Sequence, residues 1–553
     1  MTPDELSLAL TASLRAAVAA GELALAEEAI PALVKVERPK NREHGDWATN
    51  IALQLAKPAG LAPRAVAELL KGRLEAIAGV SSVDIAGPGF LNITLEAAAA
   101  GALAKNIVEA GKHYGENKAL EGQVINVEFI SANPTGPLHL AHTRWAAVGD
   151  SLARLLRASG ATVSTEYYIN DAGSQMNNFA ASVLASIKGE PTPEGGYPGA
   201  YIDELAHLVI NDHPAIKELT DEAALPVVRQ AAYQAQLADI KETLADFGVD
   251  FDVFFSEQQL HTSGAIEEAV NRLREQGHVF DQDGAVWLRT TDFTDDKDRV
   301  LIRANGEPTY FAADAAYYLS KKDRGFEQKI YLLGADHHGY IGRLKAIAAC
   351  AGDDPEHNIE VLIGQMVSVN GARLSKRAGN IVELRDLLNW LGADALRYSL
   401  GRSPANSPLS LEPEELQKAS NDNPVFYVQY AHARTKAVDR NAEAAGVGVV
   451  SADFPFDAAL LDHPTESALL AALGSFPSVV AEAAKFREPH RVARHLEVIA
   501  GAYHRWYDAC RVTPQGDEPV TDLNRTRLWL NDATGQVLAN GLELLGVSAP
   551  ERM

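Results

Sequence analysis

The chain has 553 residues and a formal net charge of −24, and its length indicates about three or four domains. Hydrophobic residues make up 46% of the sequence, which is enough for several cores and too many for a disordered chain. The acidic balance argues against non-specific DNA binding, which needs lysine and arginine opposite phosphate. It leaves open a specific RNA partner on a local basic surface.

Cysteine content and apolar runs indicate the compartment. The two cysteines, Cys350 and Cys510, predict neither a disulfide framework nor a CxxC zinc site. The longest uncharged apolar run, from Ser467, is broken by glycine and proline and is shorter than the roughly 18 residues that span a bilayer. Asp4 and Glu5 stand where a signal peptide has basic residues. We therefore expect a cytoplasmic protein that binds neither membranes nor zinc.

The first part of the chain, residues 1–112, reads as a small α+β domain. It opens with a helix after the capping residue Thr2, and an alternating stretch at 83–95 predicts a strand or hairpin. The alanine-rich segment that follows predicts a helix leading to a linker near Gly115.

Residues 118–400 alternate short apolar runs with helical patterns, which is typical of βαβ units and a parallel sheet. A helix-rich stretch at about 178–295 interrupts this alternation, and we interpret it as an insertion. Near its end Asp283-Gly284 lies between apolar runs and predicts a hairpin turn. The expected architecture is α/β, with a Rossmann-like central domain.

Residues 401–553 carry amphipathic helical patterns, and strands are expected to stop near 395. This end of the chain predicts an all-α bundle.

The most informative turn is "ISANPTGPLHLAHT", from Ile130. A strand is expected to end near Phe129 and a helix to begin near His142, so His139 and His142 would stand beyond the carboxyl end of a sheet strand, where ligands bind. A helix N-terminus there suits phosphate, and the small Gly136 and Ala141 would let a nucleotide approach. HxxH alone equally indicates helix capping, core packing or a metal pair.

A second segment, "NGARLSKRAGNIVEL" from Asn370, is basic and flanked by glycine. Alone it reads as a solvated loop. Combined with the histidine turn it predicts a two-part ATP site, with Lys376 as the main cation. GxGxxG and P-loop patterns are absent.

These two sequence segments resemble the signature motifs of the class I aminoacyl-tRNA synthetases, because HLAH is similar to their HIGH motif and RLSKR is similar to their KMSKS motif. The stretches "VEFISANPTGPLHLAHTR", "PTYFAADAAYY", "YLLGADHHGYIGRLKA" and "GADALRYSL" narrow the resemblance to the arginyl-tRNA synthetases. It runs through nearly the whole chain. The departures are Arg373 and Arg377 at the first and last positions of KMSKS, and Leu140 and Ala141 inside HIGH.

The resemblance implies an enzyme that uses ATP with Mg²⁺ to attach L-arginine to tRNA(Arg), as a monomer and with activation that requires bound tRNA. His139, His142 and Lys376 would be catalytic. The ATP site would comprise Gly136, Pro137, His139, Ala141, His142, Arg373, Ser375 and Lys376. The arginine site would comprise Glu128, Ser131, Asn133, His139, Tyr310, Asp314 and His337. Carboxylates suit a guanidinium because they accept its planar fork of donors.

The helical C-terminal region would read the anticodon, with Tyr430 and Arg434 at i and i+4 as the expected contacts. Two other hypotheses remain open. A ligase that joins an amino acid to something other than tRNA would not need the bundle, and a silent tRNA-binding paralogue would not need His139, His142 and Lys376.

Overall fold

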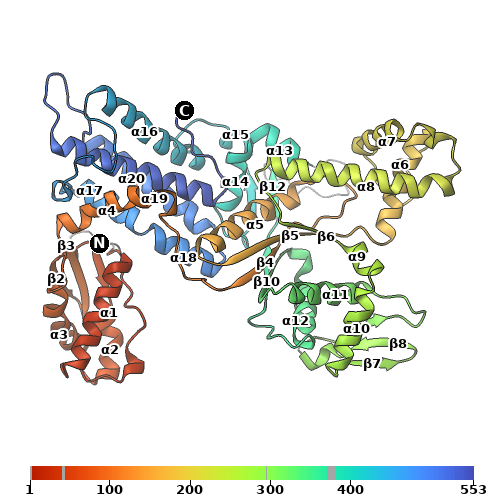
Figure 1. The fold of residues 1–553 in the computed structure, drawn as a ribbon, viewed down its shortest axis with the longest axis horizontal. Helices are drawn as coiled ribbons and strands as arrows, with labels where there is room; N and C mark the ends of the chain where they lie inside the picture. The colour runs from red at the N-terminus through yellow and green to blue at the C-terminus, as the bar shows by residue number, and fades with distance from the viewer. Residues whose placement is uncertain (1–2, 40–43, 294, 370–381) are drawn as a thin grey trace.

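The N-terminal part of the computed structural model, which describes residues 3–39, 44–293, 295–369 and 382–553, is a separate α+β unit (Figure 1). A three-stranded antiparallel sheet of order β1-β3-β2 packs against three helices. The predicted hairpin is β2–β3, and the elements are α1 (Pro3–Ala19), β1 (Trp47–Thr49), α2 (Ile51–Ala59), α3 (Pro63–Glu75), β2 (Val80–Ala86) and β3 (Phe90–Leu95). This unit has its own apolar core, which includes Leu10, Leu70 and Ile93.

The central sheet has five strands in the order β11-β10-β4-β5-β6, and all its pairs are parallel. The strand order reverses between β4 and β10, the point at which open α/β sheets bind ligands. The Rossmann-like prediction is therefore confirmed. The strands are β4 (Val124–Glu128), β5 (Thr162–Ile169), β6 (Val253–Ser256), β10 (Gln328–Gly334) and β11 (Ile359–Gly364).

Helices cover both faces of this sheet, and the glycines let α5 approach it closely. A Cβ on Gly149 would lie 2.4 Å from the Phe129 ring, and one on Gly364 would lie 2.6 Å from Trp145. The helices of this domain are α5 (Leu140–Ala158), α11 (Tyr310–Asp323), α12 (Ile341–Cys350), and α13 (Leu384–Leu391) and α14 (Ala393–Gly401), which pack on α5.

The predicted insertion, about 178–295, differs from the structure in one respect: it contains β6, a strand of the main sheet. Two excursions therefore leave the sheet. The first is a helical unit of α6 (Ser174–Lys188), α7 (Ala200–Asp212) and α8 (Asp221–Asp246), which we call the helical insertion. The second comprises α9 (Glu257–Thr262), α10 (Ala265–Glu275), β7 (Val279–Gln282), β8 (Ala285–Leu288) and β9 (Arg299–Ile302). Asp283-Gly284 forms the predicted turn between β7 and β8, both residues with positive φ.

The C-terminal region is a helical bundle, as predicted, of α16 (Pro424–Ala444), α17 (Pro464–Gly474), α18 (Phe476–Phe486), α19 (His490–Ala509) and α20 (Asp522–Leu544). By length and composition the segment 464–486 could cross a membrane, but more than half of it is buried here as α17 and α18, which pack on α19. Its apolarity is accounted for by the bundle core.

Two predicted boundaries shift. The helix α4 (Ala97–Ala110), expected in the N-terminal domain, packs on α17 and α20 of the bundle, and a Cβ on Gly101 would lie 2.2 Å from the Ala458 carbonyl oxygen. Strands also continue past 395, because β12 (Val367–Val369) pairs in parallel with β13 (Leu409–Leu411). The short α15 (Pro413–Leu416) follows.

Candidate active site

The loop after β4 has a strained start. Ile130 and Ser131 have φ of 68° and 44°, a conformation that is rare for a β-branched residue and characteristic of functional sites. The neighbouring strand β5 holds it in place. The Tyr167 hydroxyl donates to the Ala132 carbonyl oxygen at 2.9 Å, and the Tyr168 amide donates to Ser131 Oγ at 3.0 Å.

The two predicted histidines meet at the N-terminus of α5. Their rings lie 3.9 Å apart, and each accepts a backbone hydrogen bond at Nδ1: His139 from the Ala141 amide at 3.3 Å, and His142 from the His139 amide at 3.2 Å. Because Nδ1 accepts, the neutral rings carry their proton on Nε2. Two N–H donors thus accompany the positive end of a helix, an arrangement suited to phosphate.

The chain returns to these histidines after the basic segment. The Leu140 amide donates to the Val382 carbonyl oxygen at 2.9 Å, and the Leu384 amide donates to that of Leu138 at 2.8 Å. The predicted loop residues Arg373, Ser375 and Lys376 lie outside the described residues. The segment 382–384, which follows these residues in the chain, is therefore hydrogen-bonded to both sequence neighbours of His139, Leu138 and Leu140.

A cavity of about 260 Å³ opens beyond the end of β5. Its lining comes from the end of β5, the start of α9 in the second excursion, α11, and the segment after β10, and consists of Tyr168, Asn170, Glu257, Tyr310, Phe311, Asp314, Tyr340 and Arg343. The predicted pair Tyr310 and Asp314 lies on α11, as its spacing indicated, and both side chains face this cavity. The hydroxyl of Tyr340 donates to Asp314 Oδ2.

The carboxyls of this cavity oppose one another's ionisation. Desolvation, followed by the charges of Glu257 and Glu128, raises the pKa of Asp314 to about 8, against a smaller lowering by Arg343. Desolvation also raises the pKa of Glu257. A planar cation entering the cavity would relieve this repulsion, because opposite charge favours the ionised form.

Glu128, at the end of β4, is already paired. Its Oε2 lies 2.5 Å from Nζ of the fully buried Lys321, and its Oε1 accepts from Ser131 Oγ at 3.3 Å. The ammonium also lies over the rings of Tyr317 and Tyr331, 4.5 and 4.1 Å from their centroids. Glu128 thus acts on Asp314 through its charge but is itself one half of a buried ion pair and is not among the residues that line the cavity.

Replacing Lys321 with methionine is expected to lower the free energy of unfolding by about 3–5 kcal/mol, because it leaves the Glu128 carboxylate buried without its partner. The double variant Lys321→Met/Glu128→Gln should recover most of the loss. Urea unfolding measures both. A double variant as unstable as the single one would contradict this account of the pair.

The other predicted residues surround the same loop. Asn133 Nδ2 donates to Gln175 Oε1 at 2.6 Å, and Gly136 lies against Tyr201 of α7. His337 is on the 3₁₀ helix η6 (Ala335–Tyr340) after β10, with Nε2 3.5 Å from Asp336 Oδ2. These residues all lie beyond the carboxyl ends of β4 and β10, at the switch point of the sheet.

Glu257 and Arg144 are among the contributors to the site that were not found in the sequence. Glu257, which is 3% exposed, follows β6 directly; its position after an apolar run was the available signal, but that run was assigned to the insertion. Arg144 is buried in α5 and donates to the carbonyl oxygens of Ser407 at 2.5 Å and Pro404 at 2.7 Å. It fixes the helix that carries the histidines.

In the bundle, the predicted Tyr430 and Arg434 are half-buried neighbours on α16. The Arg434 guanidinium donates to the Tyr430 hydroxyl at 2.9 Å and to His504 Nδ1 at 3.0 Å, and it stacks 4.6 Å from the Tyr507 ring centroid. Burial, then the charge of Arg434, lowers the pKa of His504 to about 4. Arg434 is thus held among the rings of Tyr430, Tyr507 and His504.

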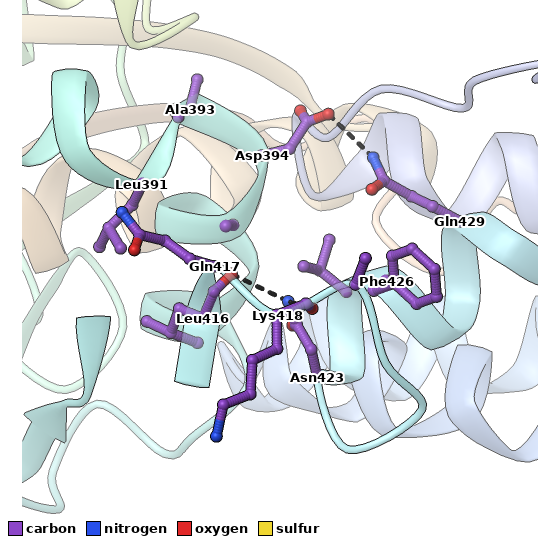
Figure 2. Close-up of a pocket in the computed structure, with 13 residues that line it drawn as sticks. Leu391, Ala393, Asp394, Leu416, Gln417, Lys418, Asn423, Phe426 and Gln429 are labelled. Carbon is purple, nitrogen blue, oxygen red and sulfur yellow. Dashed lines mark hydrogen bonds between the residues drawn. The ribbon is translucent and has the colours of Figure 1, made fainter. Parts of the chain in front are cut away.

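A larger cavity of about 580 Å³ lies between α14, α15 and α16 (Figure 2). Gln429 Nε2 donates to Asp394 Oδ2 at 2.8 Å across it, and Asn423 Nδ2 donates to the Lys418 carbonyl oxygen at 3.0 Å. No residue predicted for ATP or arginine lines this cavity. It belongs to the junction between sheet and bundle.

Comparisons with known proteins place this architecture in a class. Residues 103–438 match the family model described as the catalytic domain of class I (R) tRNA synthetases, so the sheet and its paired histidines belong to a class I aminoacyl-tRNA synthetase. Residues 4–95 match the arginyl tRNA synthetase N terminal domain, and residues 428–553 match the DALR anticodon binding domain.

Comparison with individual relatives then identifies the family within this class. The chain is 85% identical over 553 residues to the arginine–tRNA ligase of Renibacterium salmoninarum and 75% identical over 555 residues to that of Pseudarthrobacter chlorophenolicus, with each pair covered in full. The Thermus thermophilus arginyl-tRNA synthetase structure shares the fold, with a TM-score of 0.77 at 24% identity and full coverage of both chains. The chain belongs to the arginyl-tRNA synthetase family.

Proposed function

We propose that this chain attaches L-arginine to tRNA(Arg) at the expense of ATP, through an arginyl-adenylate. Family membership supports the reaction. The observation that carries the choice of amino acid is the cavity that Asp314 and Glu257 both line, because two carboxylates match the fork of a guanidinium.

In this proposal the guanidinium lies against Asp314 and Glu257, with the ring of Tyr310 at the rim. Tyr310 is 62% exposed, as a residue at the mouth of a cavity should be. The α-amino and carboxylate groups would extend toward the loop after β4. Ser131 and Asn133 would hold these two groups, and Glu128, His139 and His337 would complete the arginine site.

ATP would lie at the switch point of the sheet, with Mg²⁺ entering as part of that substrate. Nε2–H of His139 and His142 would donate to phosphate oxygens, together with Lys376, Arg373 and Ser375 of the basic loop. Gly136, Pro137 and Ala141 would leave space for the nucleotide. An arginine carboxylate oxygen bonds to the α-phosphorus as the bond to the pyrophosphate oxygen breaks. These side chains stabilise charge and exchange no proton.

The terminal adenosine of tRNA would complete the reaction. Its 2′-hydroxyl oxygen bonds to the arginyl carbonyl carbon, the bond to the phosphate oxygen breaks, and AMP leaves. Tyr430 and Arg434 would contact the anticodon loop through stacking, since unstacked bases bind to aromatic and guanidinium planes. We also propose that the enzyme is a cytoplasmic monomer that needs neither zinc nor a membrane.

Arginine affinity should depend on pH through Asp314. With its pKa near 8 in the empty cavity, the carboxyl is mostly protonated at neutral pH, and a bound guanidinium favours the ionised form. Binding then releases a proton, so the association constant for arginine rises with pH, by up to about tenfold per unit below pH 8, and levels off above it. Calorimetric titration in two buffers of different ionisation enthalpy measures the release.

Asp314→Asn is the control for this pH dependence, because an amide does not titrate in this range. The variant should bind arginine weakly and with a flat pH profile. An association constant for the unmodified enzyme that stays constant from pH 6.5 to 8 would contradict the proposed role of Asp314.

The activity itself is tested by charging bulk tRNA with each of the twenty amino acids and ATP. Arginine alone should be attached. Attachment of another amino acid would contradict the pocket assignment. Tight tRNA binding without any charging would instead support a silent paralogue, and ATP-dependent ligation to a small acceptor would support a ligase of the other kind.

A further inference from the structure

The helical insertion reaches the loop that precedes the paired histidines. Tyr201, near the start of α7, donates from its hydroxyl to the Thr135 carbonyl oxygen at 2.9 Å. A Cβ on Gly136 would lie 3.4 Å from the same hydroxyl oxygen. Gln175, near the start of α6, accepts from Asn133 at 2.6 Å. The insertion thus holds this loop at two points just before His139.

The same insertion also holds the segment that follows the basic loop. Arg385, on α13, donates to Asp239 Oδ1 at 2.9 Å and to Thr243 Oγ1 at 3.0 Å, and both of these residues are on α8. Two residues earlier, Glu383 forms an antiparallel bridge with His139. Both segments that border the proposed ATP site are therefore bonded to one helical body.

That body is internally packed. Both α6 and α7 contact α8, around a core that includes Phe179, Leu205 and Val228. Glu383 is also near enough to Tyr201 to raise the pKa of its hydroxyl further, after burial and Tyr197. Tyr201 therefore stands where the insertion, the histidine loop and the end of the basic loop converge.

We propose that Tyr201 is a positioning residue for His139 and His142, and that the helical insertion sets the placement of the loop before His139 relative to the segment 382–385 through Tyr201 and Arg385. The proposal rests on the assignment of the histidines to ATP. The Thr135 carbonyl oxygen is fixed by the tyrosine hydroxyl, and the loop leads from there to His139. A small displacement of the imidazole donors lowers the rate because phosphate stabilisation depends on alignment.

The test is Tyr201→Phe, which removes the hydroxyl and keeps the ring. We expect kcat for charging to fall about three- to tenfold, the range of one neutral hydrogen bond, and KM for ATP to rise. KM for arginine and the melting temperature should not change. Ser186→Ala is the matched control, since it also removes one hydroxyl from the insertion, where Ser186 of α6 donates to Asp203 of α7 at 2.6 Å, and it should behave as the unmodified enzyme.

Three outcomes separate the claims. An unmodified enzyme that charges no arginine would overturn the proposed function, whatever the variants do. An active enzyme whose Tyr201→Phe form has the same kcat and KM for ATP would overturn the positioning role, as would an equal rise in both KM values. In a double-mutant cycle of Tyr201→Phe with Arg385→Met, non-additive losses of kcat would support the joint positioning of the two segments by the helical insertion. Additive losses of kcat would overturn that joint role.

Discussion

Replacing Asp314 with asparagine is expected to lower kcat/KM for arginine by about two to three and a half orders of magnitude, which corresponds to the 3–5 kcal/mol lost when one partner of a buried ion pair is removed. The substitution leaves the guanidinium with Glu257 alone. KM for ATP should change little, because Asp314 faces the cavity that we assign to the arginine side chain. Asp314→Ala should be at least as severe. Steady-state charging with each substrate varied in turn measures both effects.

A matched control exists on the same helix. Asp323, the last residue of α11, forms an ion pair with Arg272 at 2.6 Å, and its side chain is 53% exposed. Asp323→Asn removes the same charge from α11 away from the cavity and should leave both KM values unchanged. If Asp314→Asn raised KM for ATP and for arginine equally, the cavity would not be the arginine pocket.

The second large effect is expected at His142. His142→Ala should slow adenylate formation by about 10²- to 10³-fold, the loss typical of one hydrogen-bond donor to a transition-state oxygen, with little change in tRNA affinity. Alanine also removes the acceptor for the His139 amide, so this variant alone does not separate capping from catalysis.

His142→Asn makes that separation. In α20 of this chain an asparagine in the same helical position, Asn524, accepts from the Thr521 amide at 2.9 Å, so asparagine can replace the cap while removing the imidazole Nε2–H. Single-turnover adenylate formation should remain slow in this variant. Recovery of the full rate by asparagine would assign His142 to capping alone.

Local patterns accounted for most of the elements. Helical spacing placed Tyr310 and Asp314 on one face of α11, and Asp283-Gly284 specified its hairpin because both residues tolerate positive φ. The predictions failed where contacts between distant parts of the chain determine the structure. The run before Glu257 is only four residues long, and its neighbours are helical, so β6 was not recognised. The helix α4 carries no signal that its partners are α17 and α20, more than 350 residues away.

The candidate site was likewise predictable only where local sequence patterns determine its geometry. Residues within one turn, such as His139 and His142, are brought together by local geometry. Glu257 follows β6, whereas Tyr340 and Arg343 follow β10, and they meet Asp314 only because the parallel sheet places the ends of these strands at one edge. The Lys321–Glu128 pair is of the same kind, since one partner lies on α11 and the other at the end of β4.

The central claim is that two carboxylates in a small cavity select a guanidinium. It is tested most directly by comparing arginine with L-citrulline, which has nearly the same shape but carries an oxygen in place of one guanidinium nitrogen and no charge. With pyrophosphate release measured in the presence of tRNA, we expect citrulline to be used about 10³-fold less efficiently than arginine or worse, because the carboxylates would be left unpaired. Comparable use of the two amino acids would contradict the account.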